Sequence, residues 1–348
     1  MALSPLKGAA REALLPAVLT AGLGLVTLPV WLFASPTVET FWSEILVRIV
    51  LVTGFYIFIG NSGVFAFGHV AFACIGGYAA AWLSMNPMFK QIMLTGLPGP
   101  VQAMQLSPWA GVAAAAAMAA LVALVVGAAI VRLSDIAASI ATFAFLVVVN
   151  RIYSNWDSVT GGVAPLTNIP QFGSIWPTFF FAAAALCVAY LFQRSRWGLM
   201  LRASRDDDVA ALATGISVYR MRLAAFVLSA AVMGAGGAVY TYFLGILTVD
   251  VFYMGLTFLM LVMLVVGGAE SLTGVVAGVV AVSTVAQLLR MAEQGVEIGG
   301  ATFALPLGLQ EISLGIFMVL VLVYRSDGIT RGRELPLPGF LKSAADAR

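Results

Sequence analysis

RSRWGLMLRASRDDDVAALATG, residues 194–215, is a charged segment within a strongly apolar chain. Seven of its first fifteen residues are charged, whereas 10% of the whole 348-residue chain is charged and 61% is hydrophobic. Apolar runs lie on both sides of the segment, at about 176–192 and 223–247. The segment is therefore expected to form a polar connection between two membrane-spanning helices.

Apolar runs recur along the whole chain, whose mean hydropathy is +1.00. A helix that crosses a bilayer needs about 20 mostly apolar residues. Runs of about this length fall at 14–34, 43–60, 63–84, 108–131, 136–152, 176–192, 223–247, 251–268, 272–290 and 306–324. The pattern predicts an all-α, polytopic membrane helix bundle with about ten transmembrane helices.

Basic residues are concentrated in alternate connections between these runs. Cytoplasmic loops of membrane proteins carry an excess of Lys and Arg. We therefore place both termini on the cytoplasmic side, with residues 1–330 forming the transmembrane domain and 331–348 a cytoplasmic C-terminal tail. If 43–84 were one span plus a re-entrant segment, the arginine-rich connection would face outward, which the charge rule disfavours. The basic residues placed inside are Lys7, Arg11, Arg132, Arg194, Arg196, Arg202, Arg205, Arg220, Arg222, Arg325, Arg331, Arg333, Lys342 and Arg348.

The sequence lacks the residue patterns of common catalytic and metal sites. None of its three lysines follows the glycine pattern of a phosphate-binding loop. The single histidine, His69, excludes a two-histidine metal site, and no GxSxG nucleophile elbow is present. We expect no enzymatic activity, no cofactor and no nucleic-acid partner, so membrane transport is the leading class.

Coupling to an ion gradient would need ionisable groups at membrane depth. The charged residues within or beside the runs all lie near predicted span ends, which disfavours a proton relay, although an ion-coupled secondary carrier stays open as an alternative. These residues are Arg48, Arg151, Glu270, Arg290 and Glu311.

A transporter that neither binds ATP nor relays ions must receive work through a partner, and the charged segment has the features of a docking helix. Ser204 followed three residues later by Asp207 resembles a capping box, and Gly215 is a natural helix terminator. Between them, small helix-forming residues predict a helix of about ten residues on the cytoplasmic face. The alternative is a solvated loop. The residues that we assign to docking are Ser204, Asp207, Asp208, Ala210, Ala211 and Gly215.

Part of this segment resembles a known signature. Asp208-x-Ala210-Ala211-x-x-x-Gly215 is similar to the Glu-Ala-Ala…Gly signature that ABC importer permeases present to their ATPase. The longer stretch 202–240 resembles the branched-chain amino-acid permease family, as does NSGVFAFGHVAFACIGGYAAAWL at 61–83. Similar motifs follow in order at 155–170, 267–280 and 324–329. The resemblance covers about residues 55–330.

The resemblance implies a transmembrane permease subunit of an ABC importer, similar to the larger of two permeases that pair as a heterodimer. It also implies two ATPase subunits, a periplasmic or extracellular solute-binding protein, and a bacterial inner-membrane location. Branched-chain or related amino acids are the expected substrates, and urea, short amides or a sugar are the alternatives. The candidate residues of the substrate pathway are Asn61, His69, Phe72, Tyr78 and Thr160.

Overall fold

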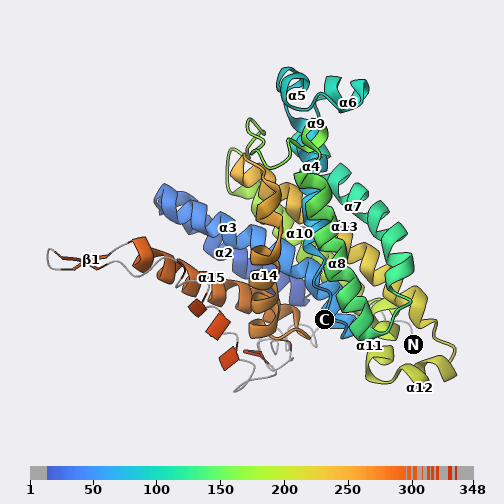
Figure 1. Cartoon of the computed structure of the whole chain (residues 1–348). Coiled ribbons are helices and arrows are strands. Elements are labelled where there is room, and N and C mark those ends of the chain that lie inside the picture. Colours follow the sequence, from blue (N-terminus) through green and yellow to red (C-terminus); the bar gives the residue numbers. More distant parts are fainter. Residues whose placement is uncertain are drawn as a thin grey trace, which may run out of the picture.

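The computed structural model describes residues 14–294 and, beyond them, residues 296–298, 301–303, 308, 312, 313, 315, 316, 319, 320, 328–330 and 334. Most of the described chain is helical (Figure 1). The helices are α2 (Leu14–Phe33), α3 (Pro36–Phe55), the π-helix η1 (Tyr56–Gly60), α4 (Val70–Ser84), α5 (Pro87–Met93), α6 (Gly99–Ala103), α7 (Pro108–Ile130), α8 (Asp135–Ser154), α9 (Asp157–Thr160), α10 (Trp176–Arg194), α11 (Arg196–Asp206), α12 (Asp208–Ala213), α13 (Val218–Leu244), the 3-10 helix η2 (Val249–Phe252), α14 (Met254–Gly267) and α15 (Leu272–Gln294). Two short antiparallel strands follow, β1 (Val296–Ile298) and β2 (Ala301–Phe303).

Within the described residues, eight helices are long and apolar enough to cross a membrane. This confirms a polytopic helical bundle. The run predicted at 63–84 corresponds to α4, which has 15 residues and is shorter than these eight. The run at 306–324 lies mostly outside the described residues, so the count of about ten spans stays a prediction. The hairpin of β1 and β2 is a small addition to the predicted all-α fold.

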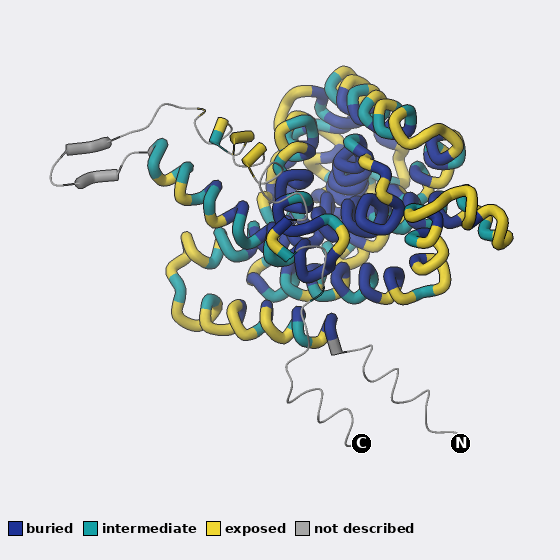
Figure 2. Tube along the Cα trace, turned by 90° about the horizontal axis from the view of Figure 1, so that it is seen from below, coloured by how far each residue is buried: buried dark blue, intermediate teal, exposed yellow. Residues whose placement is uncertain are grey.

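The centre of the bundle is formed by α3 and η1. Of the apolar window in Pro36–Gly60, 94% is buried, compared with 22% for the peripheral helix α2. Figure 2 shows the buried residues gathered in the middle of the bundle, with exposed residues around it. Because lipid is as apolar as leucine, such helices associate through close packing rather than through a hydrophobic driving force.

Small residues bring α4, α7 and α13 into close contact. A Cβ atom added to Gly76 of α4 would lie 2.2 Å from the carbonyl oxygen of Gly234 in α13, and one on Gly237 would lie 1.9 Å from that of Ala73. On another side of α13, a Cβ atom on Gly234 would lie 2.8 Å from the carbonyl oxygen of Ala115 in α7. Backbone therefore meets backbone at these crossings, and no side chain fits between the helices.

The connections between helices fall into two groups at opposite ends of the bundle. We call residues 61–69, 131–135, 195–217 and 268–271 the arginine-rich end, and residues 85–107, 155–175 and 245–253 the opposite end. Each group is joined by its own contacts, such as Gly96 N to Ser158 O (2.8 Å) at the opposite end. In Figure 1, α5, α6 and α9 lie far from α11 and α12. Since α4 runs from one end to the other, the chain reverses direction at 61–69, which favours two separate passes over 43–84.

Lys90 is a cation that lies at the opposite end of the bundle, away from the cytoplasmic group of basic residues. Its ammonium group is fully buried and donates hydrogen bonds to the carbonyl oxygens of Trp82 (3.0 Å), Val101 (2.9 Å) and Met104. Burial lowers the pKa of Lys90. The lysine thus holds α5 and α6 against the end of α4, a structural role that does not bear on membrane orientation.

Candidate functional site

The charged segment forms two helices instead of the single helix predicted to begin at Ser204. Ser204 lies buried inside α11, where its hydroxyl donates to the carbonyl oxygen of Leu201 (2.8 Å). The cap of α12 is Asp207, whose carboxylate accepts from the backbone N–H groups of Val209 and Ala210, both at 2.9 Å. Asp207 has an extended backbone, with φ −156° and ψ 104°, and this separates the two helices. The capping role predicted for Ser204 is therefore wrong.

The C-terminal end of α12 is closed as the sequence predicted. Gly215 has a positive φ of 84°, and its N–H donates to the carbonyl oxygen of Leu212 (3.0 Å). The N–H of Ile216 donates to that of Ala211 (3.0 Å). These two bonds define a Schellman motif, which satisfies carbonyl groups that a helix end would otherwise leave free. The short helix α12 is thus capped at both ends.

The exposed face of α12 does not include Ala211, which the sequence analysis assigned to docking. Ala211 is 5% exposed and packs toward the bundle, whereas Val209 and Leu212 are 78% and 60% exposed. Ala210 and Ala213 are exposed as well. We call Val209, Ala210, Leu212 and Ala213 the outer face of α12. Ala211 positions this face from behind and does not belong to it.

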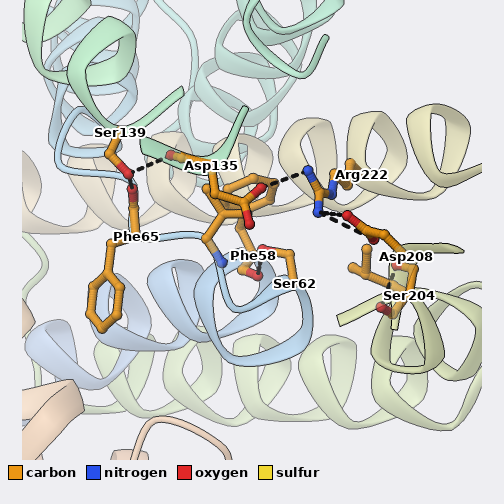
Figure 3. Close-up of polar contacts among 10 residues, drawn as sticks. Phe58, Ser62, Phe65, Asp135, Ser139, Ser204, Asp208 and Arg222 are labelled. Atoms are coloured by element: carbon orange, nitrogen blue, oxygen red, sulfur yellow. Dashed lines mark hydrogen bonds and ion pairs between the residues drawn. The ribbon is translucent and has the colours of Figure 1, made fainter. Parts of the chain in front are cut away.

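Arg222, at the start of α13, connects α12 to the bundle (Figure 3). Its guanidinium group donates to the carboxylate of Asp135 in α8 (2.8 Å) and to that of Asp208 in α12 (3.1 Å). The arginine is 9% exposed. The sequence analysis placed Arg222 only among the cytoplasmic basic residues, so this bridge was missed. The pairing depends on three segments that meet only in the folded protein.

A second arginine connects α11 to the centre of the bundle. Arg205 donates to the carbonyl oxygen of Gly60 at the end of η1 (3.1 Å) and lies 3.1 Å from a carboxylate oxygen of Glu270, between α14 and α15. A π-helix leaves local backbone bonds irregular and often occurs at functional positions. The α11–α12 segment is thus attached to α3 through Arg205 and to α8 and α13 through Arg222.

Two of the predicted pathway residues, His69 and Phe72, lie together in an aromatic cluster. The His69 ring centroid lies 5.0 Å from that of Phe226, 5.2 Å from that of Phe58 and 5.9 Å from that of Phe72. His69 is fully buried, and neither ring nitrogen has a hydrogen-bond partner of ordinary geometry in the described part of the chain. Asn61 lies at the end of η1, where its amide donates to the carbonyl oxygen of Ile57 (3.0 Å).

The other two predicted pathway residues are placed near one another by Tyr153. The Tyr78 ring packs edge-on against that of Tyr153, with centroids 5.0 Å apart. The hydroxyl of Thr160 donates to the carbonyl oxygens of Tyr153 (2.6 Å) and Trp156 (2.8 Å). Tyr78 and Thr160 are both fully buried. In this structure the two hydrogen bonds of Thr160 stabilise a turn. The assignment of both residues to a substrate pathway stays a prediction.

A cleft of about 420 Å³ lies at the opposite end, and the sequence did not indicate it. It is open to solvent between the first turns of α3 and α10, residues 171–175 and the last turn of α13. Neither of its walls contains a predicted pathway residue. Its lining residues are Glu39, Thr40, Ser43, Gln171, Phe172, Gly173, Ser174, Ile175, Thr178, Phe243 and Leu244. Among the described residues, no group of three or more His, Cys, Asp or Glu side chains could hold a metal ion.

A multi-pass helical bundle with an anchored polar helix pair at one end and a cleft at the other is the arrangement expected of a membrane transport protein. The chain matches the family model described as "Branched-chain amino acid transport system / permease component" over residues 38–323. It belongs to this family, whose members are membrane components of ABC-type transporters and not enzymes.

Individual relatives agree with this assignment. The high-affinity branched-chain amino acid transport system permease protein LivM of Escherichia coli K12 is 24% identical over 318 residues, which cover 82% of this chain and 68% of LivM. LivM of Salmonella typhimurium is 25% identical over the same shares of both chains. The nucleoside ABC transporter permease protein NupC of Lactococcus lactis is 37% identical over 81 residues, or 22% of this chain and 26% of NupC. No solved structure matches the chain.

Proposed function

We propose that this protein is a permease subunit of an ABC importer for branched-chain or related amino acids, and that separate ATPase subunits drive it by docking on α12. The family match and the names of the two LivM relatives support the substrate class. The importer would contain two ATPase subunits, a second permease subunit and a solute-binding protein, and would lie in a bacterial inner membrane. Nucleosides are the second substrate class, because a nucleoside permease shares 37% identity with part of the chain.

The observation that carries the docking proposal is the outer face of α12. Val209 and Leu212 are among the most exposed large apolar side chains at the arginine-rich end. Burying one such side chain contributes about 1.5–3 kcal/mol, so a protein partner that covers both gains considerably. The helix is also held at both termini and by Arg222. A contact surface that is already ordered loses little entropy on binding.

The two arginines supply a route by which ATPase movement would reach the spans. A push on α12 acts on α8 and α13 through Arg222, and on α3 through Arg205 and the carbonyl oxygen of Gly60. Alternating access requires bundles of helices to move against one another. Ion coupling has less support, because Arg48, the buried arginine of α3, is already paired with Glu44 and hydrogen-bonded to Ser283.

The test is Leu212→Asp in the complete importer. A carboxylate at the centre of an apolar contact would weaken docking by several kcal/mol before relaxation. Leu212 is mostly exposed, so the permease itself should fold and insert normally. We expect the ATPase subunits to be lost on purification of the permease and L-leucine uptake to fall to background.

Ala203→Asp is the matched control, because Ala203 is an exposed residue of α11 and the substitution adds the same charge at the same end. This variant should keep its ATPase subunits and its uptake. Normal ATPase recovery and normal uptake in Leu212→Asp would refute docking on α12.

A further inference from the structure

The cleft at the opposite end has the size and the mixed lining of a small-molecule site. Its volume of about 420 Å³ lies within the usual range for ligand pockets, roughly 300–1,000 Å³. One wall is the first two turns of α3, and the other is the start of α10 with residues 171–175. The last residues of α13 close the base. Such sites combine apolar surface with a few placed polar groups, and both occur here.

The α3 wall presents two polar side chains without partners. Glu39 and Ser43 are four residues apart, so they lie on the same face of the helix. Neither side chain has a hydrogen bond or ion pair with any described residue. Ser43 is 6% exposed, yet its hydroxyl reaches the cleft. Its hydroxyl, which has no partner among the described residues, can therefore donate or accept a hydrogen bond with a molecule in the cleft.

The facing wall has the opposite electrostatic character. The cap position of α10 is Ile175, which supplies no side-chain acceptor, and Pro177 in the first turn lacks an N–H group. The remaining N–H groups and the helix dipole give this end a partial positive charge that suits a carboxylate. A negative group on one side of the cleft thus faces a positive helix end on the other.

The space between these two walls is bordered by apolar side chains. Phe172, Ile175, Phe243 and Leu244 all line the cleft. Gln171 is held in place because its amide donates to the carbonyl oxygen of Leu244 (2.9 Å). The amide oxygen of Gln171 has no hydrogen bond of its own in the described part of the chain, and it can accept one.

We propose that this cleft is a binding subsite for a zwitterionic amino acid with an apolar side chain. Glu39 and Ser43 bind the ammonium group, the start of α10 binds the carboxylate, and the aromatic and aliphatic residues contact the side chain. This rests on the proposed function, since it assumes that amino acids are the substrates. The subsite lies at the end remote from α12, where a substrate would be handed over before it enters the bundle.

The experiment measures protection of a cysteine in the cleft. Thr40→Cys, in the full-length permease with Cys187→Ser and in membranes with its partners, is labelled with a water-soluble maleimide in the presence and absence of L-leucine. Cys74 is buried and should not react. We expect L-leucine to slow labelling severalfold. 4-Methylpentanoate, which lacks the amine, and 3-methylbutylamine, which lacks the carboxylate, should not slow it at the same concentration.

The variant Glu39→Gln tests the ammonium contact. Loss of a charged hydrogen bond should raise the L-leucine concentration for half-protection about tenfold or more. Val38→Cys is the matched control, because Val38 is an exposed residue of the same turn that does not line the cleft. Its labelling should not depend on L-leucine.

Several results would overturn the subsite. They are unchanged labelling of Thr40→Cys with L-leucine, equal protection in Glu39→Gln, or protection by the amine alone, which would indicate a simple cation site. Uptake of L-leucine is measured with the same membranes. Uptake without protection refutes the subsite and leaves the proposed function intact, whereas the absence of both counts against the proposed function as well.

Discussion

Replacing Arg222 with methionine should detach α12 from the bundle while leaving the bundle folded. The arginine is 9% exposed, but the carboxylates that it contacts are more open to solvent, with side-chain exposures of 59% for Asp135 and 48% for Asp208. Each pair is therefore partly screened, and the two together contribute about 1–2 kcal/mol. Methionine keeps the apolar packing of the arginine stem. A loss of this size raises the open population of α12 about 5- to 30-fold.

Hydrogen–deuterium exchange of the full-length permease measures this population. The amides of residues 209–216 should exchange faster in Arg222→Met by about the same factor, while those in the middle of α13 keep their protection. Arg220→Met is the control, since Arg220 is exposed, lies two residues away on the same helix and forms no ion pair with described residues. If exchange in residues 209–216 is the same in the wild type and in Arg222→Met, the bridge does not position α12.

Three further substitutions test the packing and the helix ends. Gly237→Ala should lower the thermal stability of the permease, because the new Cβ atom would lie 1.9 Å from the carbonyl oxygen of Ala73. Overpacking of this kind typically costs about 1–3 kcal/mol. Gly99→Ala is the control and should leave the thermal stability unchanged, because its Cβ atom meets nothing within 4 Å. Gly215 has a φ of 84°, so Gly215→Val should strain the turn after α12 by about 1–3 kcal/mol and speed hydrogen–deuterium exchange there. Gly215→Asn should be tolerated, because asparagine adopts positive φ more readily. Glu334→Ala should loosen the start of α15 by about 1 kcal/mol in the same exchange assay, because this carboxylate accepts from two of its N–H groups at 2.9 and 3.1 Å.

The transmembrane helices were the part of the fold that the sequence predicted best. Hydropathy depends only on local composition, and the run at 108–131 corresponds closely to α7, Pro108–Ile130. Boundaries were less accurate where a helix begins with polar residues. The second run was predicted from residue 43, whereas α3 begins at Pro36, because its first turns include Glu39 and Thr40 and lower the local hydropathy. Those omitted turns form one wall of the cleft.

The charged segment shows why local signals alone did not define the site. Three consecutive aspartates, Asp206 to Asp208, each favour a helix start, and sequence rules do not decide which of them will cap. The fold decides it, because burial of Ser204 extends α11 and the pairing of Asp208 with Arg222 fixes the beginning of α12. Which face of α12 is exposed likewise depends on the helices behind it. Gly215, by contrast, was predicted correctly because a positive φ is a local requirement.

The two sites lie at opposite ends of one continuous helical segment. Glu39 and Ser43 belong to the first turns of α3, and Gly60, which accepts from Arg205, ends η1. The segment Pro36–Gly60 has 25 residues, so it spans about 37 Å at 1.5 Å per residue. It is also the most buried of the candidate spans, which means that its neighbours constrain its movement along the whole length. We expect a displacement imposed on Gly60 through α11 to be transmitted along this packed segment to the wall that carries Glu39. One continuous helical segment thus lies between the Arg205 contact of α11 and the cleft, and the π-helix at Tyr56–Gly60 is the position along it where the regular backbone pattern is broken.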